Sequence, residues 1–125
     1  MTQTIMIVDD SPGVLSLYGM FFERQGYEVL KAMDSASALE MLRESVPDLF
    51  LLDVMMPEIN GIELCQRIRA MPHHEQTPVI ILSAFSDSGT IEQTFAAGAN
   101  DYVVKPIDPQ ELANRVGELL GVRER

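Results

Sequence analysis

Short apolar runs, each followed at once by a polar or charged residue, are the feature that most constrains how this chain folds. The runs cover residues 5–8, 49–52, 79–82 and 102–104. Because they are short, continuous and rich in β-branched residues, they are typical of strands that are buried on both faces. Such strands belong to parallel sheets, whose faces are covered by helices. The sequence therefore predicts an α/β fold.

The residues that follow these runs carry chemically useful side chains. Asp9 and Asp10 follow the first run, Asp53 the second, Ser83 the third and Lys105 the fourth. In an open parallel sheet the carboxyl ends of the strands share one edge, and ligands bind at that edge. We therefore expect three carboxylates, a hydroxyl and an ammonium group to line one crevice. These groups suit a divalent cation together with a phosphoryl group.

Stretches of helical periodicity separate the apolar runs. Ser11-Pro12 is typical of a helix start and Gly26 of a helix end. A second strand is expected at 27–32, followed by a helix that Ser35 caps and Pro47 stops. Later helices are expected after Asn60-Gly61, from about Ser88 to Ala97, and after Asp108-Pro109. Five strands thus alternate with five helices, and right-handed crossovers place helices on both faces of the sheet, while the pattern leaves the strand order open.

Size and charge restrict the domain count and the partners. The 125 residues are expected to form one domain over residues 1–121, with 122–125 as a tail or the start of a linker. The formal net charge of −10 argues against direct binding of nucleic acid or of an anionic membrane, because both would repel the domain.

Cysteine content and hydropathy indicate the compartment. The single Cys65 cannot form an internal disulfide, which favours a reducing cytoplasm, and on its helix it is expected to be a buried small hydrophobe. No apolar run approaches the roughly 20 residues of a membrane span, and the first residues do not resemble a leader. We therefore expect a cytoplasmic domain without a membrane partner.

The acidic residues predict a cation site. Two like charges about 4 Å apart repel by about 1 kcal/mol in water and by about 4 kcal/mol at an effective dielectric of 20. A Mg²⁺ ion relieves this repulsion, since it binds one or two carboxylates together with carbonyl and water oxygens. The plainer alternative is that Asp9 and Asp10 only begin a helix, where acidic side chains are favoured by the helix dipole.

Several stretches taken together resemble one protein family. They are IVDDS (7–11), LDVMMP (52–57) with NG (60–61), VIILSA (79–84) and GANDYVVKP (98–106). In order and spacing they are similar to the receiver domain of bacterial two-component response regulators, over essentially the whole chain. This resemblance implies a flavodoxin-like, doubly wound, five-stranded parallel sheet of order 2-1-3-4-5 with helices on both faces.

The resemblance also implies a phosphorylation site with Mg²⁺ as cofactor. Asp53 corresponds to the phosphoacceptor, which becomes 4-aspartylphosphate and also binds the metal. Asp10 corresponds to a direct metal ligand, Asp9 to an outer acid that acts partly through water, and Met55 to a ligand through its backbone carbonyl. The resemblance also implies that the Met55 side chain lies over the phosphorylation pocket. It does not determine how long the phosphoryl group persists on Asp53.

Further residues correspond to the groups that stabilise and report phosphorylation. Lys105 pairs with the acceptor and then with the phosphoryl oxygens, and the Lys105-Pro106 peptide is implied to be cis. Ser83 corresponds to the switch hydroxyl, Ala84 to a backbone N–H donor and Tyr102 to the switch aromatic. An ordinary core role for Tyr102 stays open.

The implied function is a signalling switch. A histidine kinase or a phosphotransfer protein donates the phosphoryl group, and an output domain or target protein of unknown identity responds. The domain catalyses only its own phosphorylation and dephosphorylation, so we do not class it as an enzyme. Catalysis in such a reaction is mostly positioning and neutralisation of charge on the transferred group.

Three alternative functions agree less well with the sequence. A haloacid-dehalogenase-like phosphatase needs its two acids two residues apart after the first strand, whereas Asp9 and Asp10 are adjacent. A flavodoxin-type FMN carrier needs a hydroxyl-rich phosphate loop at that place. A receiver used only as a scaffold is disfavoured because every residue expected for the chemistry is present.

His73 and His74 follow Pro72 in a polar loop and are predicted to be solvated rather than metal ligands.

Overall fold

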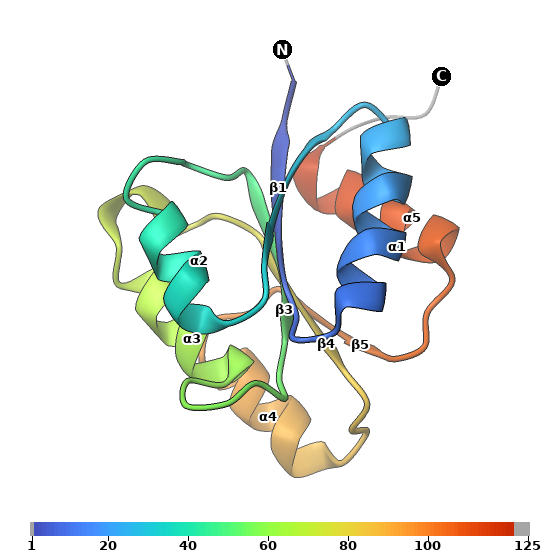
Figure 1. The fold of residues 1–125 in the computed structure, drawn as a ribbon. Helices are drawn as coiled ribbons and strands as arrows, with labels where there is room; N and C mark the ends of the chain where they lie inside the picture. Colours follow the sequence, from blue (N-terminus) through green and yellow to red (C-terminus); the bar gives the residue numbers. More distant parts are fainter. Residues whose placement is uncertain (1, 122–125) are drawn as a thin grey trace.

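A five-stranded parallel sheet forms the middle layer of the structure, with helices on both sides (Figure 1). The computed structural model describes residues 2–121. The sheet has the order β2-β1-β3-β4-β5, which confirms the doubly wound fold and the strand order implied by the resemblance. The elements are β1 (Thr4–Val8), α1 (Pro12–Arg24), β2 (Glu28–Ala32), α2 (Ser35–Met41), β3 (Leu49–Asp53), α3 (Gly61–Arg69), the 3-10 helix η1 (Pro72–His74), β4 (Val79–Ser83), α4 (Ser88–Ala96), β5 (Asp101–Val104) and α5 (Pro109–Leu120).

The sheet separates two hydrophobic cores, because successive residues of a strand point to opposite faces. On β1, Ile5 and Ile7 pack with α1 and α5, whereas Met6 and Val8 pack with α2 and α3. In Figure 1, α1 and α5 accordingly lie on one side of the sheet and α2, α3 and α4 on the other. All residues of β3 and β4 are buried, as predicted for central parallel strands. The strand ends are therefore held rigidly by packing on both faces.

Most predicted helix starts are confirmed by their capping geometry. The Ser11 hydroxyl accepts a hydrogen bond from Val14 N–H, and Pro12 is the first helical residue of α1. Asn60 caps α3 in a capping box with Glu63, whose side chain bonds back to Asn60 N–H. Each cap satisfies backbone donors that the helix itself leaves free.

The predicted limits of the second helix are wrong at both ends. Asp34, not Ser35, is the cap, since its carboxylate accepts a 2.7 Å hydrogen bond from Ser37 N–H. The Ser35 hydroxyl instead donates to the carbonyl of Ile59 at 2.7 Å. The helix ends at Met41, in a series of turns well before Pro47, so proline is not what stops it.

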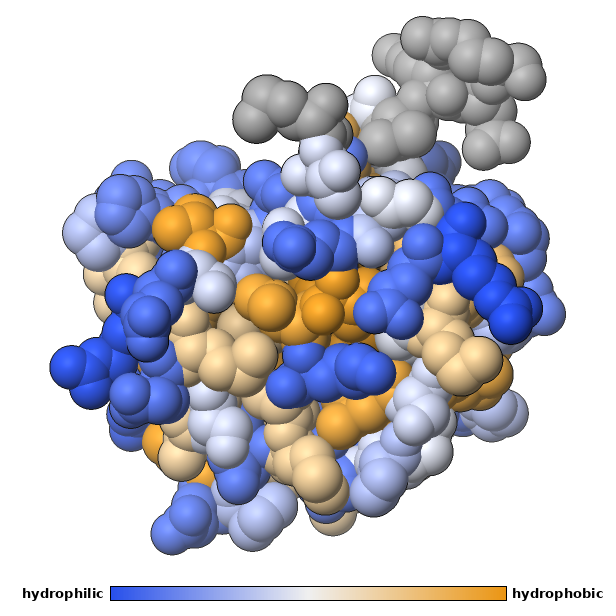
Figure 2. All heavy atoms as spheres, turned by 45° about the horizontal axis from the view of Figure 1, so that its top comes forward, coloured by the Kyte–Doolittle hydropathy of each residue, from blue (hydrophilic) through white to orange (hydrophobic). Residues whose placement is uncertain are grey.

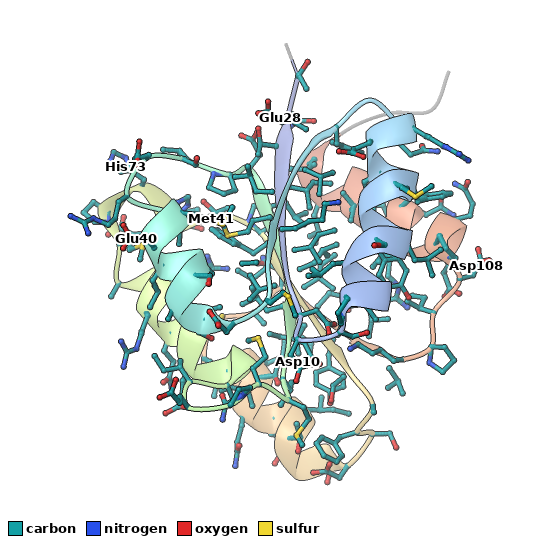
Figure 3. All side chains as sticks on the ribbon, viewed as in Figure 1. Asp10, Glu28, Glu40, Met41, His73 and Asp108 are labelled. Carbon is teal, nitrogen blue, oxygen red and sulfur yellow. The ribbon has the colours of Figure 1, made fainter. Side chains whose placement is uncertain are left out.

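The prediction that both loop histidines are solvated is wrong for His74. His73 is exposed and lies at the outer edge of the molecule (Figure 3), whereas the His74 side chain is buried. The centroids of the His74 and Phe50 rings lie 5.1 Å apart in an edge-to-face arrangement. The Nδ1 of His74 lies 2.8 Å from the Thr77 hydroxyl. Burial is the main reason why the pKa of His74 is lowered. His74 is thus a core residue; Cys65 is also buried, as predicted.

The molecular surface is mixed in character. Figure 2 shows one face, on which apolar areas are separated by hydrophilic side chains. Large apolar side chains are exposed on α1, at Leu17 and Met20, and around α4 and β5, at Phe85, Phe95 and Val104. Among residues 2–121, no helix is both long enough and apolar enough to cross a membrane. The tail or linker predicted at 122–125 lies outside the described residues.

Gly61, the first residue of α3, lies against the end of β3. Its N–H donates to the Val54 carbonyl at 3.1 Å, and a Cβ at this position would approach the Asp53 carbonyl oxygen and carbon within 2.1 and 2.8 Å. Neither contact atom belongs to a flexible side chain. Glycine is required here because α3 packs directly on the backbone that carries Asp53, not because the turn needs unusual dihedral angles.

We therefore predict that Gly61→Ala destabilises the fold. The added methyl group overpacks a backbone contact, and such changes typically cost about 1–3 kcal/mol. Urea denaturation followed by circular dichroism measures this loss. Gly13→Ala in α1 is the matched control, because the nearest atom to its new Cβ is the Ser11 hydroxyl at 3.8 Å. The exposed control should stay within about 0.5 kcal/mol of the parent, and equal stability of both variants would contradict the close approach at Gly61.

Candidate functional site

Three carboxylates meet where β1 and β3 end. Asp9 and Asp10 follow β1, and Asp53 is the last residue of β3, its neighbour in the sheet. A carboxylate oxygen from each of the three lies within 4.8 Å of one from both others. Asp9 and Asp53 are buried, whereas Asp10 is exposed at the carboxyl end of the sheet, far from Glu28 at the opposite end (Figure 3). The sequence prediction that these acids converge is confirmed by this geometry.

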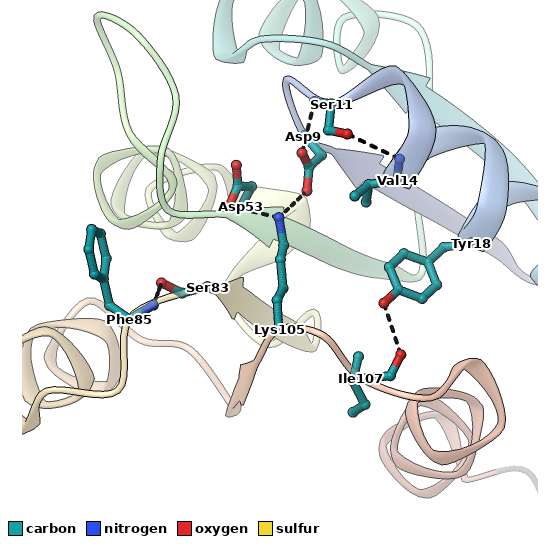
Figure 4. Close-up of polar contacts among 9 residues, drawn as sticks. All are labelled: Asp9, Ser11, Val14, Tyr18, Asp53, Ser83, Phe85, Lys105 and Ile107. Carbon is teal, nitrogen blue, oxygen red and sulfur yellow. Dashed lines mark hydrogen bonds and ion pairs between the residues drawn. The ribbon is translucent and has the colours of Figure 1, made fainter.

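The Lys105 side chain reaches into the acidic cluster from the end of β5. Its Nζ lies 2.7 Å from Asp9 Oδ2 and 3.2 Å from Asp53 Oδ1, so one ammonium group bridges two carboxylates (Figure 4). The Lys105-Pro106 peptide is cis, as the resemblance implied. The Lys105 side chain is 20% exposed, against 1% for Asp9. The bridge is therefore accessible to solvent from the lysine side.

The environment of Asp53 disfavours its charge. Burial is the main cause that raises the pKa of its carboxyl above the ordinary value of 3.8, and the neighbouring charge of Asp9 adds to this. Lys105 and a backbone hydrogen bond from Met55 lower the pKa without compensating fully. Because the folded pKa is raised, the charge costs stability at any pH above it, and this cost disappears as the pH falls through the folded pKa toward 3.8.

Lys105 is held in its charged form. Burial alone lowers its pKa, but the hydrogen bond to Asp9 and the charges of Asp53 and Asp9 together outweigh burial. The net result is that the pKa of Lys105 is raised above 10.5, so the ammonium group persists throughout the neutral range. A fixed positive charge therefore lies beside the carboxylate of Asp53.

Ser83 and Tyr102 are linked through one backbone segment. The Ser83 side chain is fully buried at the end of β4, and its Oγ accepts a 3.0 Å hydrogen bond from Phe85 N–H. The Tyr102 hydroxyl donates to the carbonyl oxygen of Phe85 at 2.8 Å. The Tyr102 ring also packs partly against the core beneath α3. Both predicted switch residues thus bind the same residue of the β4–α4 loop, Ser83 at its N–H and Tyr102 at its carbonyl oxygen.

The loop after β3 forms one wall of the site. Val54, Met55, Met56 and Pro57 line a cavity together with Asp10 and Asn60. Met55 is 56% exposed, whereas Met56 is buried. On the other side, Ala84 begins the β4–α4 loop and is exposed. The site consequently has an apolar rim beside its charged centre.

The donor set fits a hard divalent cation. The three clustered acids supply carboxylate oxygens, which are the ligands that Mg²⁺ prefers, and adjacent backbone carbonyls complete such a site. Lys105 adds the positive charge needed to bind an oxyanion next to the cation. The two loop histidines lie at η1, at the amino end of β4, and take no part in this site.

One contact in the site was not anticipated. The Tyr18 hydroxyl, from the middle of α1, donates to the carbonyl of Ile107, two residues beyond Lys105, at 3.0 Å (Figure 4). The Tyr18 ring is buried in the core beneath α1. A tyrosine instead of phenylalanine at a buried position is a signal that a hydroxyl needs a partner, but it does not identify the partner.

Comparison with known sequences identifies the family. Residues 5–117 match the family model described as response regulator receiver domain. The chain is 38% identical over 120 residues to the transcriptional regulatory protein SrrA of Staphylococcus aureus, an alignment that covers 96% of this chain and 48% of SrrA. The chain spans less than half the length of the first curated relatives it matches.

Solved structures agree with this assignment. Chemotaxis protein CheY4 of Vibrio cholerae superposes with a TM-score of 0.91 at 26% identity, covering 95% of this chain and 99% of CheY4. The receiver domain of the sensor histidine kinase PA1611 from Pseudomonas aeruginosa, solved with a magnesium ion in its active site cleft, gives a TM-score of 0.88 at 28% identity, covering 97% of this chain and 99% of that one. These matches do not support the alternative of a haloacid-dehalogenase-like phosphatase. The chain therefore belongs to the response regulator receiver domain family.

Proposed function

We propose that this receiver domain accepts a phosphoryl group on Asp53 in a Mg²⁺-dependent reaction, from a histidine kinase or a phosphotransfer protein. The observation that carries the proposal is the Lys105 ammonium group, which bridges Asp9 and Asp53 while Asp10 completes an acidic cluster around the same point. A nucleophile, a cation site and a fixed positive charge thus lie within one crevice.

The transfer consists of an in-line displacement at phosphorus. An Asp53 carboxylate oxygen attacks and forms a new P–O bond, while the bond from phosphorus to the donor breaks and the donor keeps its electron pair. Because little covalent chemistry is left to the protein, catalysis comes from positioning and from neutralising the equatorial oxygens. The same site hydrolyses the phosphoaspartate when water replaces the donor, which makes the domain a self-limiting switch rather than an enzyme with external substrates.

Asp9, Asp10 and Asp53, with the Met55 carbonyl, would hold the magnesium ion. When bound, the ion neutralises part of the charge on the transferred group and relieves the repulsion among the carboxylates. The clustering of the three acids supports this assignment, as does the magnesium ion in the receiver domain of PA1611. The exposed Asp10 is open to a hydrated ion, whereas the buried Asp9 contacts Lys105 directly.

Lys105 changes partners during the transfer. In the unphosphorylated state its ammonium group lies 3.2 Å from Asp53 Oδ1. Once Asp53 carries a phosphoryl group, a phosphoryl oxygen replaces the carboxylate oxygen as the partner, and the contact with Asp9 keeps the lysine oriented. Backbone N–H groups of the Ala84 region supply further donors to the same group.

The phosphorylation signal passes through Ser83, Phe85 and Tyr102. The Ser83 hydroxyl binds Phe85 N–H in this state, so a move toward a phosphoryl oxygen breaks that bond. Among residues 2–121, the hydrogen bond from Tyr102 to the Phe85 carbonyl is then the one that remains on this backbone, which can shift. A charge-assisted hydrogen bond is about twice as strong as a neutral one, which biases the balance between the two arrangements.

The output surface is the side of the molecule formed by α4, β5 and α5. Phe85, Phe95 and Val104 expose apolar side chains on the β4–α4 loop, on α4 and on β5, next to Tyr102. SrrA is a transcriptional regulatory protein about twice as long as the aligned region, which supports an attached output domain as the target. A separate target protein would use the same surface.

We predict that Asp53 is the only residue phosphorylated by acetyl phosphate in the presence of Mg²⁺. Intact-mass spectrometry should show one added phosphoryl group, which acid and hydroxylamine remove because it is an acyl phosphate. Asp53→Asn should abolish the addition. Asp48→Asn is the matched control, since Asp48 lies at the opposite end of β3, where its carboxylate accepts a hydrogen bond from Thr4 N–H. Labelling of Asp53→Asn at the level of the control would exclude Asp53 as the acceptor.

Ser83→Ala is predicted to separate phosphorylation from its readout. The variant keeps Asp53 and Lys105, so it should still be labelled, but it lacks the hydroxyl that links the site to Phe85. Amide chemical shifts induced by beryllofluoride, a phosphoryl mimic, should shrink by more than half at Tyr102 and at residues 88–96. The exposed Ser86→Ala serves as control and should respond like the parent. Shifts of parental size in Ser83→Ala would show that the signal takes another route.

A further inference from the structure

The Tyr18 hydroxyl is a buried polar group that joins two distant parts of the chain. Tyr18 is 4% exposed in the middle of α1, and its hydroxyl donates to the Ile107 carbonyl at 3.0 Å. The two residues are 89 positions apart in the sequence. A buried hydroxyl needs a hydrogen-bond partner, and here that partner belongs to the segment that carries Lys105.

This segment, residues 105–108, is fixed by contacts on each side of Pro106. Lys105 N–H donates to the Ser83 carbonyl at 2.7 Å, which ties the segment to β4. After the proline, the Ile107 side chain packs into the core between α1 and α5, and its carbonyl binds Tyr18. Tyr18 therefore supplies the polar anchor of the segment on the α1 side, as Figure 4 shows.

The same helix also fixes Asp9. The N–H of Ser11, at the start of α1, donates to Asp9 Oδ1 at 2.9 Å, while the other oxygen of Asp9 binds Lys105 Nζ at 2.7 Å. One rigid element thus positions both members of an ion pair, the acid through Ser11 and the backbone of the lysine through Tyr18. Both partners of the ion pair are therefore connected to α1 by hydrogen bonds.

We propose that Tyr18 is a positioning residue for phosphoryl transfer, which holds the backbone of the 105–108 segment so that the Lys105 ammonium group stays directed at Asp53 when its partner changes to a phosphoryl oxygen. The inference rests on the proposed function of Asp53. The Lys105 backbone N–H is bonded to the Ser83 carbonyl, and its ammonium group is bonded to Asp9 and Asp53. Loss of the hydrogen bond at Ile107 removes one of the contacts that hold this segment in place, and the ammonium group then shifts relative to Asp53. A displacement of about 1 Å in a reacting group costs as much as 10²-fold in rate.

Two tyrosines of the same core, Tyr18 and Tyr27, provide a matched pair. Tyr18→Phe removes only the hydroxyl and keeps the ring in the core. Tyr27→Phe makes the same change in the same core, at a hydroxyl that does not bind the 105–108 segment in the described part of the chain.

Initial rates of phosphorylation by acetyl phosphate at saturating Mg²⁺ compare these variants. Tyr18→Phe should be slower than the parent by about tenfold, within the range expected for a misplaced group. Tyr27→Phe should stay within about twofold of the parent. A Tyr18→Phe rate within twofold of the parent would overturn the inference while Asp53 phosphorylation of the parent stands.

A double-mutant cycle distinguishes positioning of Lys105 from general weakening of the fold. If Tyr18 acts through Lys105, Tyr18→Phe should change the rate by less than about twofold in a Lys105→Ala background, because the group that it positions is gone. An equal tenfold loss in both backgrounds would show a purely structural effect and would overturn the inference.

A measurement without phosphate makes the test independent of the proposed function. In NMR spectra of the unphosphorylated protein, Tyr18→Phe should shift the Lys105 amide and the Lys105 Cε–Hε signals and speed hydrogen exchange of the Lys105 amide. Tyr27→Phe should leave all three unchanged. Unchanged Lys105 signals in Tyr18→Phe would overturn the inference even if the rates differ, whereas failure of the parent to label Asp53 would overturn the proposed function instead.

Discussion

The repulsion among Asp9, Asp10 and Asp53 is the interaction on which the rest of the site depends. Their oxygens lie within 4.8 Å of one another, and two of the three side chains are buried. At such distances each pair of charges repels by a few kcal/mol at the effective dielectric of a protein. Lys105 offsets only part of what disfavours the charge of Asp53, since burial first and the charge of Asp9 second still raise the pKa of its carboxyl. Binding of a cation therefore lowers the repulsion within the cluster. This explains why the cluster suits a cation and, beside that cation, a phosphoryl group.

The fold maintains this unfavourable arrangement because its strand ends cannot move apart. The acids follow β1 and β3, which pair in register from Ile5 with Leu49 to Val8 with Leu52 and are buried on both faces. Gly61 lets α3 lie against the backbone at Asp53. On the opposite face, α1 fixes Asp9 and the segment that carries Lys105. The apolar packing of the strands and helices thus holds the charged side chains together at the edge of the sheet.

The sequence predicted what depends on local pattern and missed what depends on distant contacts. The strands and the convergence of the acids followed from apolar runs that end in polar residues, because parallel strands place their carboxyl ends together. The α2 limits were wrong because Ser35 bonds to Ile59 and leaves the cap to Asp34. The burial of His74 depends on Phe50 and Thr77, which the local loop pattern does not reveal. The strand order came from family resemblance, since periodicity alone leaves it open.

The central claim is that the acidic cluster costs stability until a cation binds, and the free energy of unfolding of Asp53→Asn measured against the parent tests it most directly. In EDTA at neutral pH the variant should be more stable, because burial and Asp9 disfavour the charge that it removes. At a Mg²⁺ concentration ten times the dissociation constant, the parent should gain about 1.4 kcal/mol, and the variant less. A variant that is less stable than the parent in EDTA, or that gains as much from Mg²⁺, would contradict the account.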